Sequence, residues 1–156
     1  MLDIPRSRFR ILVVDDNVAI LDRLRALLET QPELTVVGSA TDGIDAVRLA
    51  KILMPDLVIM DVRMPHMNGI DATRAIIADD PRAKILCHSM HPEEELARTV
   101  LQAGARGYLL KGCSFDELKE AIHEILAGGA CFPPGLDVAT DAGLRYEAGA
   151  KKGSAE

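Results

Sequence analysis

The sequence predicts an α/β fold, a (βα)5 doubly wound parallel sheet, on the basis of three observations. Short apolar runs alternate five times with segments whose apolar residues recur at helical spacing. Proline, glycine and aspartate punctuate the chain between these segments. The 156 residues, 48% of them hydrophobic, suffice for one core of ordinary domain size. We therefore expect one domain, over residues 9–127.

The first two strand and helix units are expected before Pro55. A strand is predicted over residues 10–14 and a helix over 20–28, where leucines recur on one face. A weaker strand over 34–37 precedes a helix over 44–53, which Pro55 closes.

The third unit begins with a strand over residues 56–60. It opens into a loop over 63–69, whose proline and glycine interrupt any regular pattern. A helix over 70–78 follows, and the fourth strand is expected over 84–88.

The last two helices carry recognisable ends. The fourth is predicted to start near Pro92, with glutamates in its first turn, and to end at Gly104. After a strand over 107–110, Ser114 and Glu117 have the spacing of a capping box at the start of the fifth helix.

Right-handed crossovers between parallel strands restrict how five such units can be arranged. They allow a flavodoxin-like sheet of strand order 2-1-3-4-5, with helices on both faces. In this order the topology switches between strands one and three, and ligands bind at such switch points.

Charged residues follow three of the predicted strands. Asp15 and Asp16 come after the first, Asp61 after the third and Lys111 after the fifth. Because the carboxyl ends of parallel strands meet at one edge, we expect these side chains to gather there. Crowded carboxylates repel one another, and a hard cation such as Mg²⁺ relieves that repulsion. The pattern indicates phosphoryl chemistry at Asp61.

Composition excludes several other classes of protein. The net charge of −6 and pI near 5.2 argue against nucleic-acid binding through this surface. The N-terminus has no apolar signal region and no run could span a membrane, so we expect a cytoplasmic protein. Cys87, Cys113 and Cys131 form no C-x-x-C pair, which predicts reduced thiols and no zinc site.

Residues 128–156 differ in composition from the rest. They hold six of the twelve glycines, together with Pro133 and Pro134, as a linker or tail would. This stretch is too short for a complete helix-turn-helix domain.

The charged residues also carry a resemblance. The Asp15-Asp16 pair, the run 61–65 followed by Met67 and Gly69, Ser89 and the run 104–111 resemble the receiver domain of bacterial two-component response regulators. The resemblance covers residues 9–127. Within that family, the motif Gly-Ala-x-Gly-Tyr-Leu-Leu-Lys and the residues after Ser89 resemble the NarL/LuxR-type transcription factors.

The resemblance implies a role for each residue of the predicted site. Asp61 would accept a phosphoryl group from a histidine kinase or a small phosphodonor. Asp16 would bind Mg²⁺ directly, Asp15 would bind it through a water or orient it, and the backbone carbonyl of Arg63 would be a further ligand. Lys111 would pair first with Asp61 and then with the phosphoryl oxygens.

The resemblance also implies a switch. Ser89 would offer its hydroxyl to the phosphoryl group, and Tyr108 would reorient with it, shifting an equilibrium between two packings. The expected partners are the cognate sensor kinase, a second copy of the chain on phosphorylation, and DNA only through an output domain outside this chain. Only self-phosphotransfer and autodephosphorylation are expected, not enzymatic turnover.

Each of these residues also has an ordinary structural explanation. The aspartate pair could be a turn or a helix cap, Lys111 a solvated edge charge and Tyr108 a core aromatic. Coincidence, however, explains poorly that four positions fall in order at the ends of strands one, three, four and five. The functional interpretation is therefore favoured.

Three alternatives remain beside a transcription-factor receiver. The chain could be a stand-alone receiver acting by protein contact or phosphorelay. A Mg²⁺-dependent phosphohydrolase of the haloacid dehalogenase type would need a second acid two residues after Asp61, where Arg63 stands. A flavodoxin-like binding module would need a glycine-rich phosphate loop after strand one, which the sequence lacks.

Two residues depart from the family pattern. His88 stands where receivers usually have an apolar residue, so we expect its ring to find a partner or reach solvent, where it could tune the switch. Gly112 replaces a common proline after Lys111, which leaves the geometry of that loop open.

Overall fold

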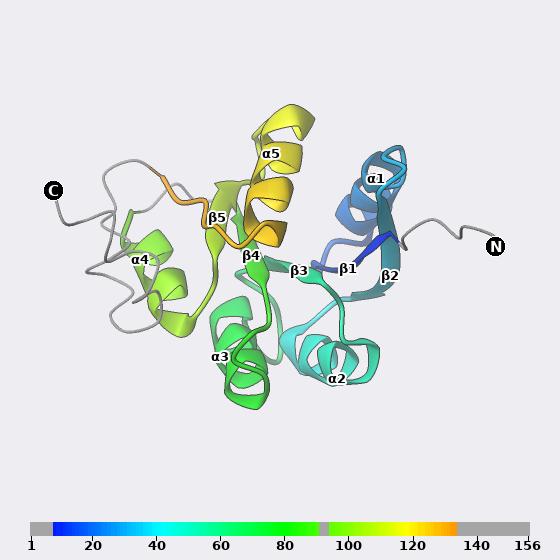
Figure 1. Ribbon diagram of the computed structural model, residues 1–156. Helices are drawn as coiled ribbons and strands as arrows, with labels where there is room; N and C mark the ends of the chain where they lie inside the picture. Colours follow the sequence, from blue (N-terminus) through cyan, green and yellow to red (C-terminus); the bar gives the residue numbers. More distant parts are fainter. Residues whose placement is uncertain (1–7, 91–93, 134–156) are drawn as a thin grey trace, which may run out of the picture.

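A computed structural model describes residues 8–90 and 94–133 of the chain (Figure 1). Its centre is one parallel sheet of strand order β2-β1-β3-β4-β5, which confirms the predicted order. The strands are β1 (Phe9–Val14), β2 (Leu34–Ala40), β3 (Leu57–Asp61), β4 (Ile85–Ser89) and β5 (Gly107–Leu110).

Five helices cover the sheet. They are α1 (Val18–Leu28), α2 (Gly43–Leu53), α3 (Gly69–Asp79), α4 (Glu94–Ala103) and α5 (Phe115–Leu126). Figure 1 shows α1 and α5 on one face and α2, α3 and α4 on the other. The start of α4 predicted near Pro92 lies outside the described residues, and its predicted end at Gly104 agrees with the last helical residue.

The sheet divides the core into two apolar layers. Successive strand side chains point to opposite faces, so Leu12 and Val14 pack toward α2 and α3, whereas Ile11 and Val13 pack toward α1 and α5. Because both faces are covered, β1, β3 and β4 need apolar residues in succession. This is why these strands stand out as continuous runs in the sequence.

The second strand is longer than predicted. It continues past Val37 to Ala40, and its end pairs with the last residues of β1, including Val14. The register skips one residue at Val37, as in a β-bulge. Gly38 and Ser39 have low strand propensity, so only pairing with β1 explains why they are extended.

Side-chain caps fix where the helices begin. Asn17, Asp42 and Asn68 each accept hydrogen bonds from backbone N–H groups in the first turn of α1, α2 and α3. The predicted capping box of α5 is confirmed, since Ser114 and Glu117 each bond to the other's backbone N–H.

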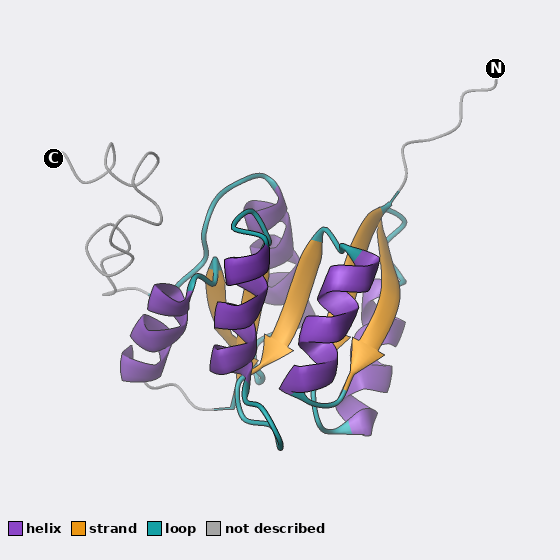
Figure 2. Ribbon diagram, turned by 90° about the horizontal axis from the view of Figure 1, so that it is seen from below, coloured by secondary structure: helices purple, strands orange, loops and turns teal. Residues whose placement is uncertain are grey.

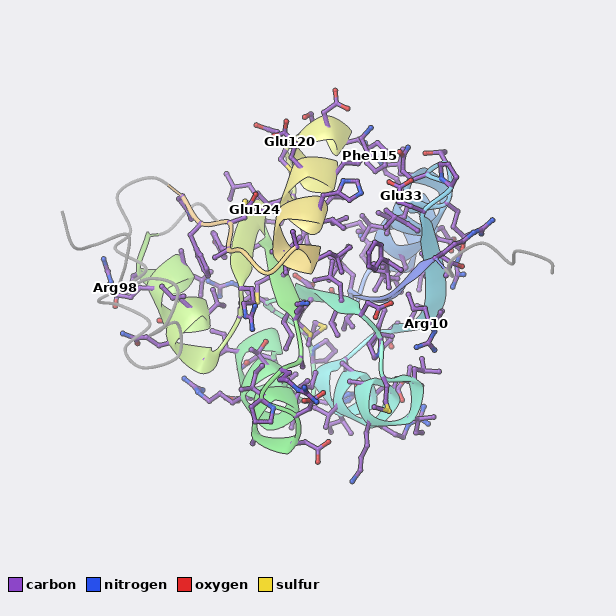
Figure 3. The ribbon with its side chains drawn as sticks, viewed as in Figure 1. Arg10, Glu33, Arg98, Phe115, Glu120 and Glu124 are labelled. Carbon is purple, nitrogen blue, oxygen red and sulfur yellow. The ribbon has the colours of Figure 1, made fainter. Side chains whose placement is uncertain are left out.

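At the surface, α5 is also linked through polar side chains to the loop between α1 and β2. His123 of α5 lies 2.9 Å from Glu33, which Figure 3 labels beside α1. The three cysteines are free, as predicted. Among the described residues, none of the helices has the length and apolar character needed to cross a bilayer.

Candidate functional site

The predicted charged residues come from the carboxyl ends of four strands. Asp15 directly follows β1, Asp61 and Ser89 are the last residues of β3 and β4, and Lys111 directly follows β5. All strands run in the same direction (Figure 2), so these ends lie along one edge of the sheet. The topology therefore brings together residues up to 96 positions apart, the separation of Asp15 and Lys111.

Lys111 is the centre of a buried ion-pair cluster. Its Nζ lies 2.6 Å from Oδ2 of Asp15 and 3.0 Å from Oδ1 of Asp61. The Asp15 and Asp61 side chains are 1% and 7% exposed, and that of Lys111 is 9% exposed. Burial lowers the pKa of Lys111, but its bonds to Asp15 and Asp61 outweigh burial and raise the pKa above its usual value. The ammonium is therefore charged at neutral pH.

The surroundings of Asp61 favour its neutral form, whereas those of Lys111 favour its charged form. Burial and then the neighbouring charge of Asp15 raise the pKa of Asp61 to about 6, against the opposing effect of Lys111. Asp16 adds a smaller repulsion. A carboxylate with this pKa is ionised at pH 7, yet its charge is costly to keep.

Asp15, Asp16 and Asp61 form the one group of potential metal ligands found in the described part of the chain. Their carboxylate oxygens all lie within 4.8 Å of one another, and Asp16 is exposed while the other two are buried. Three carboxylates face a single ammonium, so negative charge remains in excess when all are ionised. An all-oxygen donor set with excess negative charge fits a hard divalent cation such as Mg²⁺.

Two supporting residues were not recognised from the sequence. The backbone N–H of Asn17 donates to Oδ1 of Asp15 over 2.9 Å, while the Asn17 side chain caps α1. Gly69 was predicted as a loop breaker and as part of the motif behind the resemblance, without a structural role, and its N–H donates to the carbonyl of Val62 over 2.7 Å. A Cβ at Gly69 would collide with the carbonyl oxygen of Asp61. The S/T/N-type cap signal could have identified Asn17, whereas nothing local marks the close approach at Gly69.

The predicted switch residues lie beside this cluster. Ser89 is buried at the end of β4, and its carbonyl accepts from the Lys111 N–H over 2.8 Å. Tyr108 is 3% exposed on β5, opposite Cys87 of β4. Arg63 lies in the loop two residues after Asp61 with its side chain exposed.

His88 finds no hydrogen-bond partner among the described residues. It is 6% exposed, points away from the Ser89 side of β4 and lines a cavity of about 390 Å³ on the α1 and α5 side of the sheet. Burial, and then the charge of Lys111, lower the pKa of His88 to about 4, so the ring is neutral. The loop geometry left open at Gly112 is that of a trans peptide bond at an exposed glycine, and nothing lies within 4 Å of where a Cβ would be.

Comparison with known proteins agrees with this geometry. Residues 11–123 match the response regulator receiver domain family. The chain is 37% identical over 131 residues to the transcriptional regulatory protein DegU of Brevibacillus brevis, covering 84% of this chain and 56% of DegU. The chain thus spans little more than half the length of that relative.

Solved structures point to the same subfamily. A LuxR-family two-component response regulator from Aurantimonas sp. SI85-9A1 is 39% identical, with a TM-score of 0.79 over 87% of this chain and 96% of that one. The receiver domain of NarL from Mycobacterium tuberculosis is 31% identical, with a TM-score of 0.76 over 79% of this chain and 99% of that one. Residues 11–123, with the acidic cluster and Lys111 at the sheet edge, thus belong to the response regulator receiver family, and their relatives are NarL/LuxR-type two-component regulators.

Proposed function

We propose that Asp61 is the phosphoacceptor of this receiver and takes a phosphoryl group from a phosphohistidine of a sensor kinase. One observation carries the proposal: a buried, ionised carboxylate lies 3.0 Å from an ammonium and beside two further carboxylates. Such an arrangement supplies a nucleophile and a cation for the transferred charge in one place.

The transfer follows from the protonation states. A carboxylate oxygen of Asp61, ionised at pH 7, attacks the phosphorus as the bond to the kinase histidine breaks, and an acyl phosphate forms. Lys111 pairs with the new phosphoryl oxygens, because an ammonium is a compact charge that can follow the anion. Asp15 keeps Lys111 near the site throughout, at 2.6 Å in this structure.

Asp15, Asp16, Asp61 and the backbone carbonyl of Arg63 would hold Mg²⁺. When bound, this ion supplies charge neutralisation for the carboxylates and the phosphoryl oxygens. Asp16 is the exposed member of the cluster and so faces arriving ions, whereas Asp15 is tied to Lys111 and to the Asn17 N–H. The chain's own residues orient the oxygen donors before any ion arrives.

The switch is proposed to run through Ser89 and Tyr108. The Ser89 hydroxyl bonds to the new phosphoryl group, and the Tyr108 ring occupies the space that Ser89 leaves. Phosphorylation thereby shifts the population between two packings of β4 and β5. The readout is proposed to be homodimer formation, and control of transcription through a DNA-binding part beyond this chain. The similarity to DegU over only 56% of its length supports a separate output part.

This role requires one phosphoryl transfer per activation, with slow self-hydrolysis in place of turnover on free substrates. A stand-alone receiver that acts by protein contact shares the same chemistry and differs only in its output. A phosphohydrolase would differ in turnover, which separates it from both.

The test is labelling with acetyl phosphate and Mg²⁺, followed by intact mass measurement. The wild-type chain should gain one phosphoryl group, and Asp61→Asn should gain none. Asp71→Asn, an exposed aspartate paired with Arg74, is the matched control and should label like wild type. Equal labelling of Asp61→Asn would remove Asp61 from this role, and sustained phosphate release from many small esters would support the hydrolase instead.

A further inference from the structure

The segment that follows α5 lies against the sheet. Figure 1 shows this segment in orange beside β5, and we name residues 129–133 the strap. After α5 the chain turns at Gly128, whose φ of 103° lies in the left-handed region that favours glycine. Two backbone hydrogen bonds of 2.9 Å then tie the strap to β5, from the Tyr108 N–H to the Cys131 carbonyl and from the Cys131 N–H to the Arg106 carbonyl.

The strap behaves as a very short sixth strand. Cys131 forms a parallel bridge with Gly107, on the outer edge of β5. Cys131 packs into the apolar layer under α1 and α5, and the next residue, Phe132, packs into the opposite layer. Successive residues thus point to opposite faces, as in any strand. The strap covers part of an edge that would otherwise expose unpaired backbone groups.

Gly107 allows this close pairing. A Cβ at Gly107 would lie 3.1 Å from the Cys131 carbonyl oxygen and 2.8 Å from Ile125 Cδ1. Both neighbours are therefore packed closely against the glycine backbone.

The strap contacts the residue that the proposed function makes the switch. Phe132 joins the same apolar cluster as Tyr108, and the Tyr108 N–H is one of the two donors in the strap pairing. Backbone and side chain of the strap therefore both depend on the position of Tyr108. In the structure the Tyr108 ring is buried, at 3% exposure, with the strap paired beside it.

The packing around the strap leaves room for a second arrangement. Tyr108, Phe132 and Pro133 line a cavity of about 690 Å³ together with Leu110 and Met90, both of which are exposed. A tightly filled core would hold one arrangement, whereas a strap held by two backbone hydrogen bonds beside such a cavity can exchange between paired and unpaired states.

We propose that the strap is the element that reads Tyr108, and that phosphorylation of Asp61 strengthens its pairing with β5. The inference rests on the proposed function. The phosphoryl group draws Ser89 and Lys111 toward Asp61, so the Tyr108 ring, already buried, also fills the space that Ser89 leaves and is held more firmly between β4 and the strap. Phe132 packs against the apolar cluster that holds the Tyr108 ring, and the Cys131 carbonyl accepts a hydrogen bond from the Tyr108 backbone N–H. The chain continues from the strap beyond residue 133, so the strap is the covalent link between the receiver and whatever follows it.

Amide hydrogen exchange tests the inference. Phosphorylation with acetyl phosphate and Mg²⁺ should slow exchange at the Tyr108 and Cys131 amides by about fivefold or more, the lower end of usual coupling between sites. The Asp56 amide, bonded to the Arg10 carbonyl at the far end of the sheet, is the internal control and should not change.

Coupling is reciprocal, so weakening the strap must weaken the phosphorylated state by the same factor. Phe132→Ala should lower the affinity for beryllium fluoride with Mg²⁺, a phosphoryl mimic, whereas Phe132→Leu should retain it. Cys131→Pro, which lacks the donating N–H, should act like Phe132→Ala, with Cys131→Ser as its matched control.

The outcomes separate this inference from the proposed function. A chain that is phosphorylated on Asp61 but whose Tyr108 and Cys131 amides exchange at an unchanged or faster rate would overturn the strap and leave the phosphoacceptor intact. Equal beryllium fluoride affinity in all four strap variants would also overturn it. If no labelling occurs at Asp61, both fail.

Discussion

Asp61 and His88 are buried neighbours, of which Asp61 is charged at neutral pH and His88 is not. They are register partners on β3 and β4, and both are buried, at 5% and 6% exposure. Asp61 has an ammonium at 3.0 Å and keeps its charge at neutral pH. His88 makes no hydrogen bond within the described residues, and its pKa falls to about 4.

Both side chains point to the α1 and α5 side of the sheet, because register partners share a face, so the difference lies in what surrounds each of them. Asp61 lies 3.0 Å from Lys111 in the cluster that Asp15 completes. His88 lines a cavity of about 390 Å³ whose walls include Leu24 and Leu118 as well as the charged residues Arg23 and Lys111. Burial imposes a cost on both ionised forms. The chain offsets that cost only at Asp61, which indicates that charge is needed there and not at His88.

The largest effect on stability is expected when Lys111, the cation that pairs with Asp61, is removed. Lys111→Ala should destabilise the protein by about 3–5 kcal/mol at pH 7 without Mg²⁺, because Asp15 and Asp61 are left buried and unpaired. The loss should shrink at pH 5, where Asp61, with a pKa of about 6, is mostly protonated. Urea unfolding at both pH values measures this. Arg74→Ala removes an exposed pair and should cost less than about 1 kcal/mol.

A loss of stability in Lys111→Ala no larger than in Arg74→Ala would show that the cluster needs no cation. If the variant is too unstable to purify at pH 7, the pH 5 measurement still distinguishes a charge effect from a packing effect, since packing does not depend on protonation.

The next largest effect is the pH dependence that His88 imposes. A histidine whose pKa is lowered on folding takes up a proton more readily when unfolded, so stability is lost as pH falls from about 6.5 to about 4. His88→Leu should remove about 2–3 kcal/mol of that loss. The difference in unfolding free energy between wild type and variant, measured across this range, isolates His88 because Asp61 is present in both. A difference that does not vary with pH would contradict a buried neutral ring.

A smaller effect of opposite sign is expected at Asp61. Its raised pKa means that the folded chain holds its proton longer, so the carboxylate costs stability that appears as pH rises from about 4 to 6. Without divalent cations, Asp61→Asn should be more stable than wild type by about 1–2 kcal/mol at pH 7 and equal to it near pH 4. Added Mg²⁺ should narrow the gap by stabilising only the wild type.

Thermal unfolding with EDTA and with Mg²⁺ measures both effects, with Asp71→Asn as the control for an exposed aspartate. A less stable Asp61→Asn in EDTA would mean that the pair with Lys111 outweighs burial.

The smallest effect is expected at His123, an exposed histidine that does have a partner. Its pair with Glu33 at 2.9 Å links α5 to the α1 side, but both side chains are largely solvated, at 47% and 39% exposure. His123→Ala should therefore change the free energy of unfolding by less than about 1 kcal/mol. A double-mutant cycle with Glu33→Gln measures the pair. A coupling energy between His123 and Glu33 as large as the effect of His88→Leu would contradict the expectation that solvent exposure makes this pair weak.

Much of the fold was predictable from the sequence because its signals are local. Continuous apolar runs marked the buried strands, the Ser114 and Glu117 spacing marked a helix start, and Gly104 marked a helix end. The end of β2 was not predictable, since Gly38 and Ser39 are extended only through pairing with β1. The same holds for Gly69, whose missing side chain matters only because β3 and α3 approach closely there.

The sequence by itself determined which residues would meet, because parallel strands end at one edge and charged residues follow those ends. It also determined the receiver family, through motifs that contain Asp61 and Lys111. Only the tertiary structure decided the surroundings of particular groups: Lys111 bridges Asp15 as well as Asp61, and His88 is buried without a hydrogen-bond partner among the described residues. It also decided that residues after α5 pair with β5. Solvation and pairing depend on what surrounds a group in three dimensions, and neighbours along the chain do not specify those surroundings.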